Sequence, residues 1–144
     1  MKSKFSASWN HSVQVRKQRK FRYNAPLHIR HKFLSAHLSK ALRQKFNKRS
    51  LPLRKGDEVL VMRGAFKKKQ AKVLSTDRLF NKIILEGIQR SKKDGTKVNV
   101  PLDPRVLQII TLNLEDKQRL AVLNRKSTSQ QTSKTTQGVK NASK

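Results

Sequence analysis

The distribution of charge is the feature that most constrains this chain. No Asp or Glu precedes Asp57, so the 14 Lys and Arg residues of the first 53 positions have no acid in their own segment to pair with. All 8 acids lie within residues 54–126, against 18 bases. A net charge of +27 on 144 residues repels itself unless a polyanion neutralises it. Nucleic acid is therefore the partner that we expect.

Composition argues against several classes of function. A hydrophobic content of 35% allows only a small, local core. The chain has no Cys, and its four His lie in the acid-free segment, so we expect no metal site and no cofactor. No apolar run approaches the ~20 residues of a membrane span, and we expect a soluble intracellular protein without membrane contact.

The sequence also argues against catalysis, because the parts of a catalytic site are missing. Asp57 and Glu58 are adjacent and would point to opposite faces of a strand, so they cannot act as a pair. No Gly-rich phosphate loop joins a strand to a helix. We expect neither an enzyme nor a small-molecule substrate.

The first 53 residues are predicted to be a basic extension that binds RNA. Residues 1–15 show no periodicity and are expected to stay flexible until bound. In the basic run of residues 16–23, Phe21 and Tyr23 are predicted to stack on bases. The alternative for such a run is a solvated charged face.

Two short helices are predicted within this extension. Asn24-Ala25-Pro26 is typical of a turn that begins a helix from His28 to Leu34. In the second helix Ser39 is the expected N-cap, and the spacing of Leu38, Leu42 and Phe46 predicts one apolar face. Asn47 is its expected end.

After Pro52 the period changes to that of strands. Val59 and Val61 alternate with more polar positions, and further strands are predicted at 71–74, 83–85, 97–100 and 107–112. Asn81-Lys82 is the expected turn between Leu79-Phe80 and residues 83–85, and Asp94-Gly95 is the strongest turn signal. Five short strands indicate a mostly β fold, a small closed or partly closed barrel.

A helix capped by Asn113, with Glu115 and Asp116 in its first turn, is expected to follow. The predicted organisation is a basic RNA-binding extension (1–53), a barrel (54–112), a C-terminal helix (113–126) and a disordered tail (127–144).

The middle of the chain resembles a KOW motif. The residues that carry this resemblance are Arg54-Lys55-Gly56-Asp57-Glu58-Val59, Val61, Arg63-Gly64, Lys67 and Lys72-Val73. Flanking residues, among them Tyr23 to Pro26, Leu38 to Lys40, and Asp94 to Thr96, extend it over about residues 15–126. Over that length the chain resembles the large-subunit ribosomal proteins of the universal family twenty-four, of the eukaryotic and archaeal type called twenty-six.

The resemblance implies an SH3-like barrel without catalytic activity that binds large-subunit ribosomal RNA near the nascent-chain exit, beside neighbouring ribosomal proteins. It also implies a place on the cytoplasmic ribosome, with nucleolar assembly in a eukaryote. This chain has Lys68 and Ala71 where the family pattern has Gly, a residue that often serves a positive φ. The alternatives are a KOW-type transcription or RNA-processing factor and a membrane-active cationic protein.

The predicted RNA-binding residues come from the extension and from the KOW segment. They are Arg16, Lys17, Arg19, Lys20, Arg22, Tyr23, His28, Arg30, His31, Lys32, Lys40, Arg43, Lys45, Lys48, Arg49, Arg54, Lys55, Arg63, Lys67, Lys68, Lys69 and Lys72.

Overall fold

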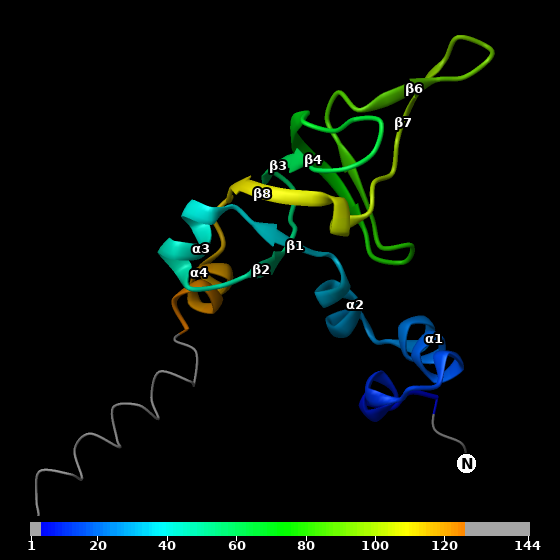
Figure 1. Ribbon diagram of the computed structural model, residues 1–144, viewed down its shortest axis with the longest axis vertical. Coiled ribbons are helices and arrows are strands. Elements are labelled where there is room, and N and C mark those ends of the chain that lie inside the picture. Colours follow the sequence, from blue (N-terminus) through cyan, green and yellow to red (C-terminus); the bar gives the residue numbers. More distant parts are fainter. Residues whose placement is uncertain (1–3, 126–144) are drawn as a thin grey trace, which may run out of the picture.

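A computed structural model describes residues 4–125 of the chain (Figure 1). The N-terminal part consists of a 3-10 helix, η1 (Ala7–His11), and two α-helices, α1 (Val15–Asn24) and α2 (Leu27–Phe33). We call residues 4–33 the arm. In Figure 1, η1 and α1 stand apart from the sheet, and α2 leads the chain into its first strand.

The strands form one six-stranded sheet in the order β2-β1-β8-β3-β4-β5. Their bounds are β1 Ser35–Leu38, β2 Ser50–Pro52, β3 Glu58–Val61, β4 Gln70–Asp77, β5 Lys82–Leu85 and β8 Leu107–Thr111. β1 pairs with β8 in parallel, and the other pairs are antiparallel. The register shifts between Val73 and Ser75, and Ile83 exchanges two hydrogen bonds with Leu102, at 2.9 and 2.8 Å. The sheet is thereby curled into the predicted small SH3-like barrel.

The barrel core follows the alternation seen in the sequence. Val59 and Val61 are 0% and 1% exposed, and Ile109 on the neighbouring strand is equally buried. Because β3 lies between β8 and β4, its inward side chains pack against both partners. These central strands confirm the prediction.

Two strands of the six-stranded sheet lie where the sequence predicts none. β1 and β2 belong to the extension, on the basic side of residue 53, yet they complete the sheet next to β8. Leu34, Ala36 and Leu38 are at most 2% exposed and belong to the barrel core. Strands β1 and β2 are too short for an alternation of apolar and polar residues to be recognised in the sequence.

Helix α1 also lies outside the prediction. Its basic residues form one exposed surface, and Phe21 alone is buried, so no apolar stripe marks the helix in the sequence. The turn before α2 is as expected. Helix α3 (Lys40–Phe46) confirms its predicted ends, since Ser39 accepts a hydrogen bond from the Leu42 N–H and Asn47 ends the helix at φ 51°. Leu38, predicted on the apolar face of this helix, belongs to β1 instead.

The expected strand residues Leu79 and Phe80 lie instead in a turn, 68% and 76% exposed. Asp77 Oδ1 accepts the N–H groups of Leu79 (2.8 Å) and Phe80 (3.2 Å) and so ends β4 early. That part of the strand prediction was wrong. The turn spans residues 78–81, so Asn81 lies in it as expected, whereas Lys82, the other predicted turn residue, already begins β5.

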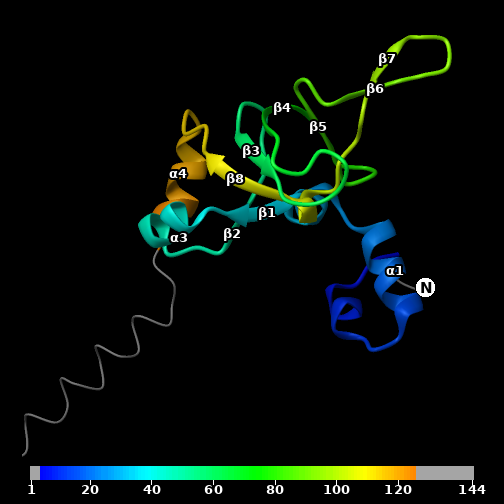
Figure 2. The same ribbon diagram turned by 45° about the horizontal axis from the view of Figure 1, so that its top comes forward.

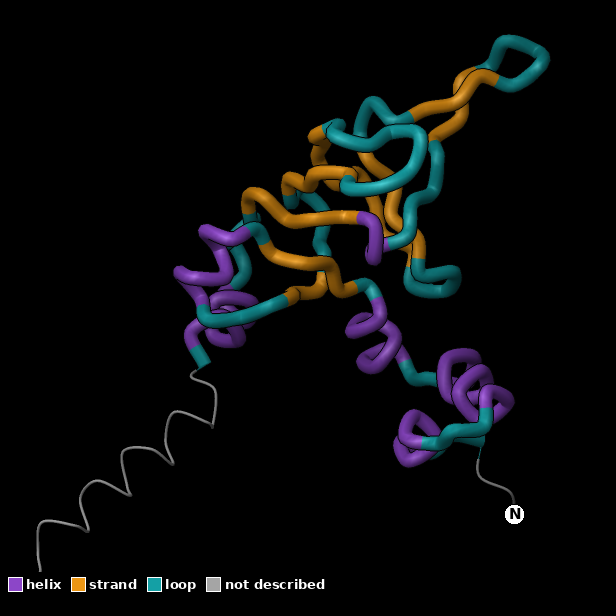
Figure 3. The backbone as a smooth tube through the Cα atoms, in the orientation of Figure 1, coloured by secondary structure: helices purple, strands orange, loops and turns teal. Residues whose placement is uncertain are grey.

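Strands β6 (Gln89–Ser91) and β7 (Lys97–Asn99) form a hairpin that projects from the barrel (Figure 3). Asp94 Oδ1 accepts from the Thr96 hydroxyl (2.7 Å) and N–H (3.0 Å), and these bonds hold the pKa of Asp94 below its usual value. The hairpin turn at Asp94-Gly95 is confirmed.

The last helix, α4 (Lys117–Asn124), begins later than predicted. Its N-cap is Asp116, which accepts the Gln118 N–H at 2.8 Å, so the assignment of the cap to Asn113 was wrong. Helices α3 and α4 lie side by side at one end of the sheet in Figures 1 and 2. The expected disordered tail, 127–144, lies outside the described residues. Within residues 4–125, no helix is long and apolar enough to cross a membrane.

Candidate nucleic-acid interface

A buried ion pair anchors the elements that carry the KOW residues. Asp57 is fully buried, and both of its carboxylate oxygens accept from the Arg119 guanidinium at 2.6 Å. The same carboxylate accepts the N–H groups of Arg54 (2.9 Å) and Asn113 (3.0 Å). One side chain thus fixes the segment before β3, the segment after β8 and helix α4.

Arg119 is equally committed to this contact. It is 5% exposed and also donates to the carbonyls of Asn113 (2.8 Å) and Pro52 (3.3 Å). Beside the pair, Gly56 has φ +87°, and a Cβ there would lie 3.0 Å from Asn113 Nδ2. No spacing signal in the sequence marks a pair 62 positions apart. Because it is enclosed, this pair positions its neighbours and offers nothing to a ligand.

Most of the predicted RNA-binding residues are exposed. Seventeen of the 22 lie at the surface: Arg16, Lys17, Arg19, Lys20, Arg22, Tyr23, His28, Lys32, Lys40, Lys45, Arg49, Lys55, Arg63, Lys67, Lys68, Lys69 and Lys72. Lys72 forms an exposed ion pair with Glu58, with 3.9 Å between Lys72 Nζ and Glu58 Oε1. Such a pair is weak and leaves the ammonium group accessible to phosphate.

The other five predicted residues are half-buried and have contacts within the chain. Arg30 donates to the carbonyls of Ala25 (2.8 Å) and Tyr23 at the end of α1. Arg43 donates to the Leu38 carbonyl at 2.8 Å, and Lys48 to the Arg125 carbonyl at 3.1 Å. Arg54 pairs with Asp116, and His31 of α2 faces a cavity that it shares with residues of β2 and α4. The four Lys and Arg side chains of this group hold the fold as well as adding positive charge.

The environment of His31 favours its neutral form. Burial lowers its pKa first, and the guanidinium groups of Arg54, Arg78 and Arg119 lower it further. It shares a cavity of about 310 Å³ with His28, Lys32 and residues of β2 and α4. A neutral imidazole can accept or donate a hydrogen bond there, but it adds no charge to the surface.

Aromatic residues of the arm pack on each other. Phe21 is 8% exposed, with its ring centroid 5.4 Å from Phe5 and 5.8 Å from Phe33. Phe5 also contacts Trp9, edge to face at 6.3 Å. We call these four rings the arm cluster. The prediction that Phe21 stacks on bases was wrong, because its faces are covered, whereas Tyr23 is 81% exposed.

The loop between β3 and β4 has a glycine-like backbone conformation at position 68, where this chain has Lys. Lys68 has φ 69°, and its N–H donates to the Val61 carbonyl at 2.8 Å. The hydrogen bond holds the residue in the left-handed region, which costs a side chain about 1–2 kcal/mol. The loop therefore presents Lys67, Lys68 and Lys69 together at the surface.

Four exposed Lys and Arg residues of the β6–β7 hairpin are not among the predicted RNA-binding residues. They are Arg90, Lys92, Lys93 and Lys97. Their position on both sides of the Asp94-Gly95 turn was the available signal, because residues that flank a tight turn share one tip. Among residues 4–125, no group of three His, Asp or Glu is placed to hold a metal ion.

The fold and the charge define a class of protein, the KOW-type barrels that carry a basic extension. A family model of ribosomal proteins, which comprises the eukaryotic L26 proteins and their archaeal L24 counterparts, matches residues 12–126. The chain belongs to this family, whose members are structural proteins rather than enzymes.

Two archaeal relatives show how far the similarity extends. Large ribosomal subunit protein uL24 of Methanosphaera stadtmanae is 44% identical over 115 residues, which are 80% of this chain and 98% of that protein. The protein of the same name from Korarchaeum cryptofilum is 47% identical over 110 residues, 76% of this chain and 84% of that protein. The family match itself, residues 12–126, takes in α1, α2, the barrel and α4.

Proposed function

We propose that this chain is a constituent of the large ribosomal subunit, where it binds and stabilises large-subunit ribosomal RNA near the nascent-chain exit. It contacts neighbouring ribosomal proteins, supports subunit assembly and translation, and works on the cytoplasmic ribosome, with nucleolar assembly in a eukaryote. The observation that supports this most is the set of 17 exposed predicted residues, 16 of them basic or His. Most lie in the arm, α3 and the β3–β4 loop, and the other three are Arg49, Lys55 and Lys72. The two relatives are named as proteins of that subunit.

The mechanism follows from the distribution of these charges. Each Lys or Arg that meets a phosphate releases condensed counterions, so affinity depends steeply on salt and weakly on sequence. An RNA helix has a major groove too deep and narrow for side chains, so contacts fall on backbone, 2′-hydroxyls and unpaired bases. The barrel acts as a rigid base that orients the loop and the arm. The division of the chain at residues 53, 112 and 126 is part of this proposal.

Replacing Lys67, Lys68 and Lys69 by Ala tests the loop's role. Barrel stability should change by less than about 0.5 kcal/mol, as for other surface positions. The log–log salt slope for binding to large-subunit RNA should fall by about one unit for each phosphate that the variant no longer neutralises. A matched variant with Lys92, Lys93 and Lys97 changed to Ala removes equal charge from the β6–β7 hairpin. Equal losses in both would mean that net charge, rather than the loop, carries binding.

Sedimentation separates the proposal from a transcription or processing factor. A ribosomal protein should migrate with large subunits and stay there in moderate salt. Release into the soluble fraction at the salt of the cell would reject the ribosomal role.

A further inference from the structure

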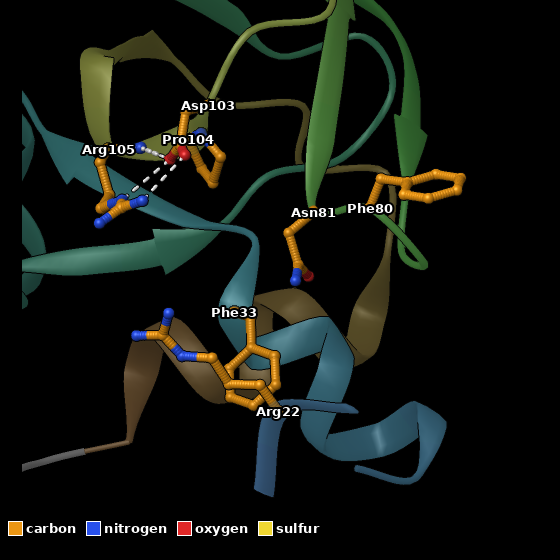
Figure 4. Close-up of a pocket in the computed structure, with 7 residues that line it drawn as sticks. All are labelled: Arg22, Phe33, Phe80, Asn81, Asp103, Pro104 and Arg105. Atoms are coloured by element: carbon orange, nitrogen blue, oxygen red, sulfur yellow. Dashed lines mark hydrogen bonds and ion pairs between the residues drawn. The ribbon is translucent and has the colours of Figure 1, made fainter. Parts of the chain in front are cut away.

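A cleft between the arm and the barrel adjoins the interface described above at Arg22 (Figure 4). Its volume is about 300 Å³, at the small end for a ligand pocket. Arg22 and Phe33 of the arm line one side, and Phe80, Asn81, Asp103, Pro104 and Arg105 of the barrel line the other. In Figure 4 the Asn81 side chain points from the β4–β5 turn toward the part of the arm that carries Phe33.

The charges of this cleft favour an anionic ligand. Asp103 accepts from the Arg105 guanidinium in two bonds of 3.1 Å, which lower the pKa of Asp103, and Lys82 lies 3.9 Å away. The carboxylate is therefore already neutralised. Arg22 is exposed and lines the cleft, so its charge is available to a ligand phosphate.

The remaining lining fits a nucleobase. Asn81 Oδ1 is buried without a hydrogen-bond partner among the described residues, a state that costs free energy until a donor arrives. A carboxamide pairs with the N6 amino group and N7 of adenine through two hydrogen bonds. Phe80, 76% exposed, offers an aromatic face at the rim of the cleft, where a base can stack.

We propose that this cleft binds an unpaired adenine nucleotide, with the base at Asn81 and Phe80 and the phosphate at Arg22. The inference rests on the proposed RNA-binding function and names one contact within it. A nucleotide of the bound RNA and a free adenine nucleotide share this chemistry. A nucleotide of the bound RNA is favoured over a free nucleotide, because Arg22 belongs to α1. The other Lys and Arg side chains of this helix are exposed and would hold the adjoining phosphates.

The test compares single-stranded oligo(A) and oligo(U) of about 12 nucleotides, long enough to reach the arm. The full chain should bind oligo(A) roughly fivefold more tightly or better, as expected for one good bidentate pair. Asn81→Gly should abolish this preference and leave the salt slope unchanged. Glycine accepts the Asn81 backbone, whose φ is 53°. Asn47→Gly is the matched control, because Asn47 also has a positive φ, 51°, and ends α3 away from the cleft.

Each outcome decides between the proposals. Equal binding of both oligonucleotides, or a preference that survives in Asn81→Gly, would overturn the adenine site and leave RNA binding intact. Failure to bind either strand, or large-subunit RNA, would overturn the proposed function as well. AMP should bind far more weakly than oligo(A), since it lacks the neighbouring phosphates. AMP binding as tight as oligo(A) would overturn the assignment to RNA in favour of a free nucleotide.

Discussion

In the barrel, fourteen buried hydrophobic residues form one continuous cluster, and a single buried ion pair fastens α4 to it. In the arm, four aromatic rings pack on one another, while the bases of α1 are exposed. The barrel therefore has a continuous hydrophobic core. The arm has only a small aromatic cluster, and it has no acidic residues to balance its charge. The difference assigns stability to the barrel, and phosphate contact to the arm together with the β3–β4 loop of the barrel.

The largest effect is expected at the ion pair. Arg119→Met leaves Asp57 buried without its cationic partner, and we expect a loss of about 3–5 kcal/mol in the free energy of unfolding. Urea denaturation followed by circular dichroism measures it. Arg105→Met, which breaks the exposed pair with Asp103, is the control and should cost less than about 1 kcal/mol. Similar losses in both variants would mean that the buried pair does not hold the barrel.

Breaking the arm cluster should leave the barrel unaffected. Phe21→Ala removes the ring between Phe5 and Phe33, so we expect the fluorescence of Trp9, the one Trp of the chain, to shift to longer wavelength. The barrel's free energy of unfolding should change by less than about 0.5 kcal/mol, as for sites that share no partners. Tyr23→Ala, at an exposed position, is the control. A barrel destabilised by Phe21→Ala would show that the two regions fold as one unit.

A smaller gain is expected in the β3–β4 loop. Lys68→Gly relieves a side chain held at φ 69°, and we expect stabilisation of up to about 1 kcal/mol. Lys69→Gly, next to it but with no positive φ, should instead destabilise slightly. Thermal unfolding of both variants measures the difference. No gain from Lys68→Gly would mean that the lysine makes compensating contacts in the loop.

The smallest effect concerns His31, where arm and barrel meet. Its pKa is lowered in the folded protein, so the unfolded chain binds the proton more tightly. Stability should therefore be unchanged above the ordinary histidine pKa of about 6.5 and fall as the pH drops below it. His31→Gln should flatten this dependence, and His28→Gln should keep it. Urea titrations between pH 8 and about pH 5 measure both, and an unchanged slope in His31→Gln would contradict the assignment.

The sequence predicted the parts of the molecule that depend on local pattern. Alternation identified β3, and Ser39 and Asn47 identified the ends of α3. The Asp94-Gly95 turn was equally clear. Strong local signals of this kind need no knowledge of distant contacts.

What the sequence could not predict depends on contacts between distant segments. Strands β1 and β2 are short and exist because β8 offers an edge for pairing. Asp57 and Arg119 meet across 62 positions, and the arm cluster joins Phe5 to Phe33. The composition alone predicts that many Lys and Arg side chains are exposed. It does not predict which Lys and Arg side chains instead make contacts that hold the fold. Arg30 and Arg43 bind carbonyl groups that only the folded chain brings to them.

Deleting residues 1–26 tests the division of labour between arm and barrel most directly. The deletion removes seven Lys and Arg residues together with η1 and α1, and it leaves α2 and β1 in place. We expect the log–log salt slope for large-subunit RNA to fall by about 0.7–0.9 for each phosphate that is no longer neutralised, with barrel stability nearly unchanged. Deleting residues 127–144, which removes three bases, should change the slope much less. Equal slopes in the two truncated proteins, or unfolding of the barrel without residues 1–26, would contradict the account.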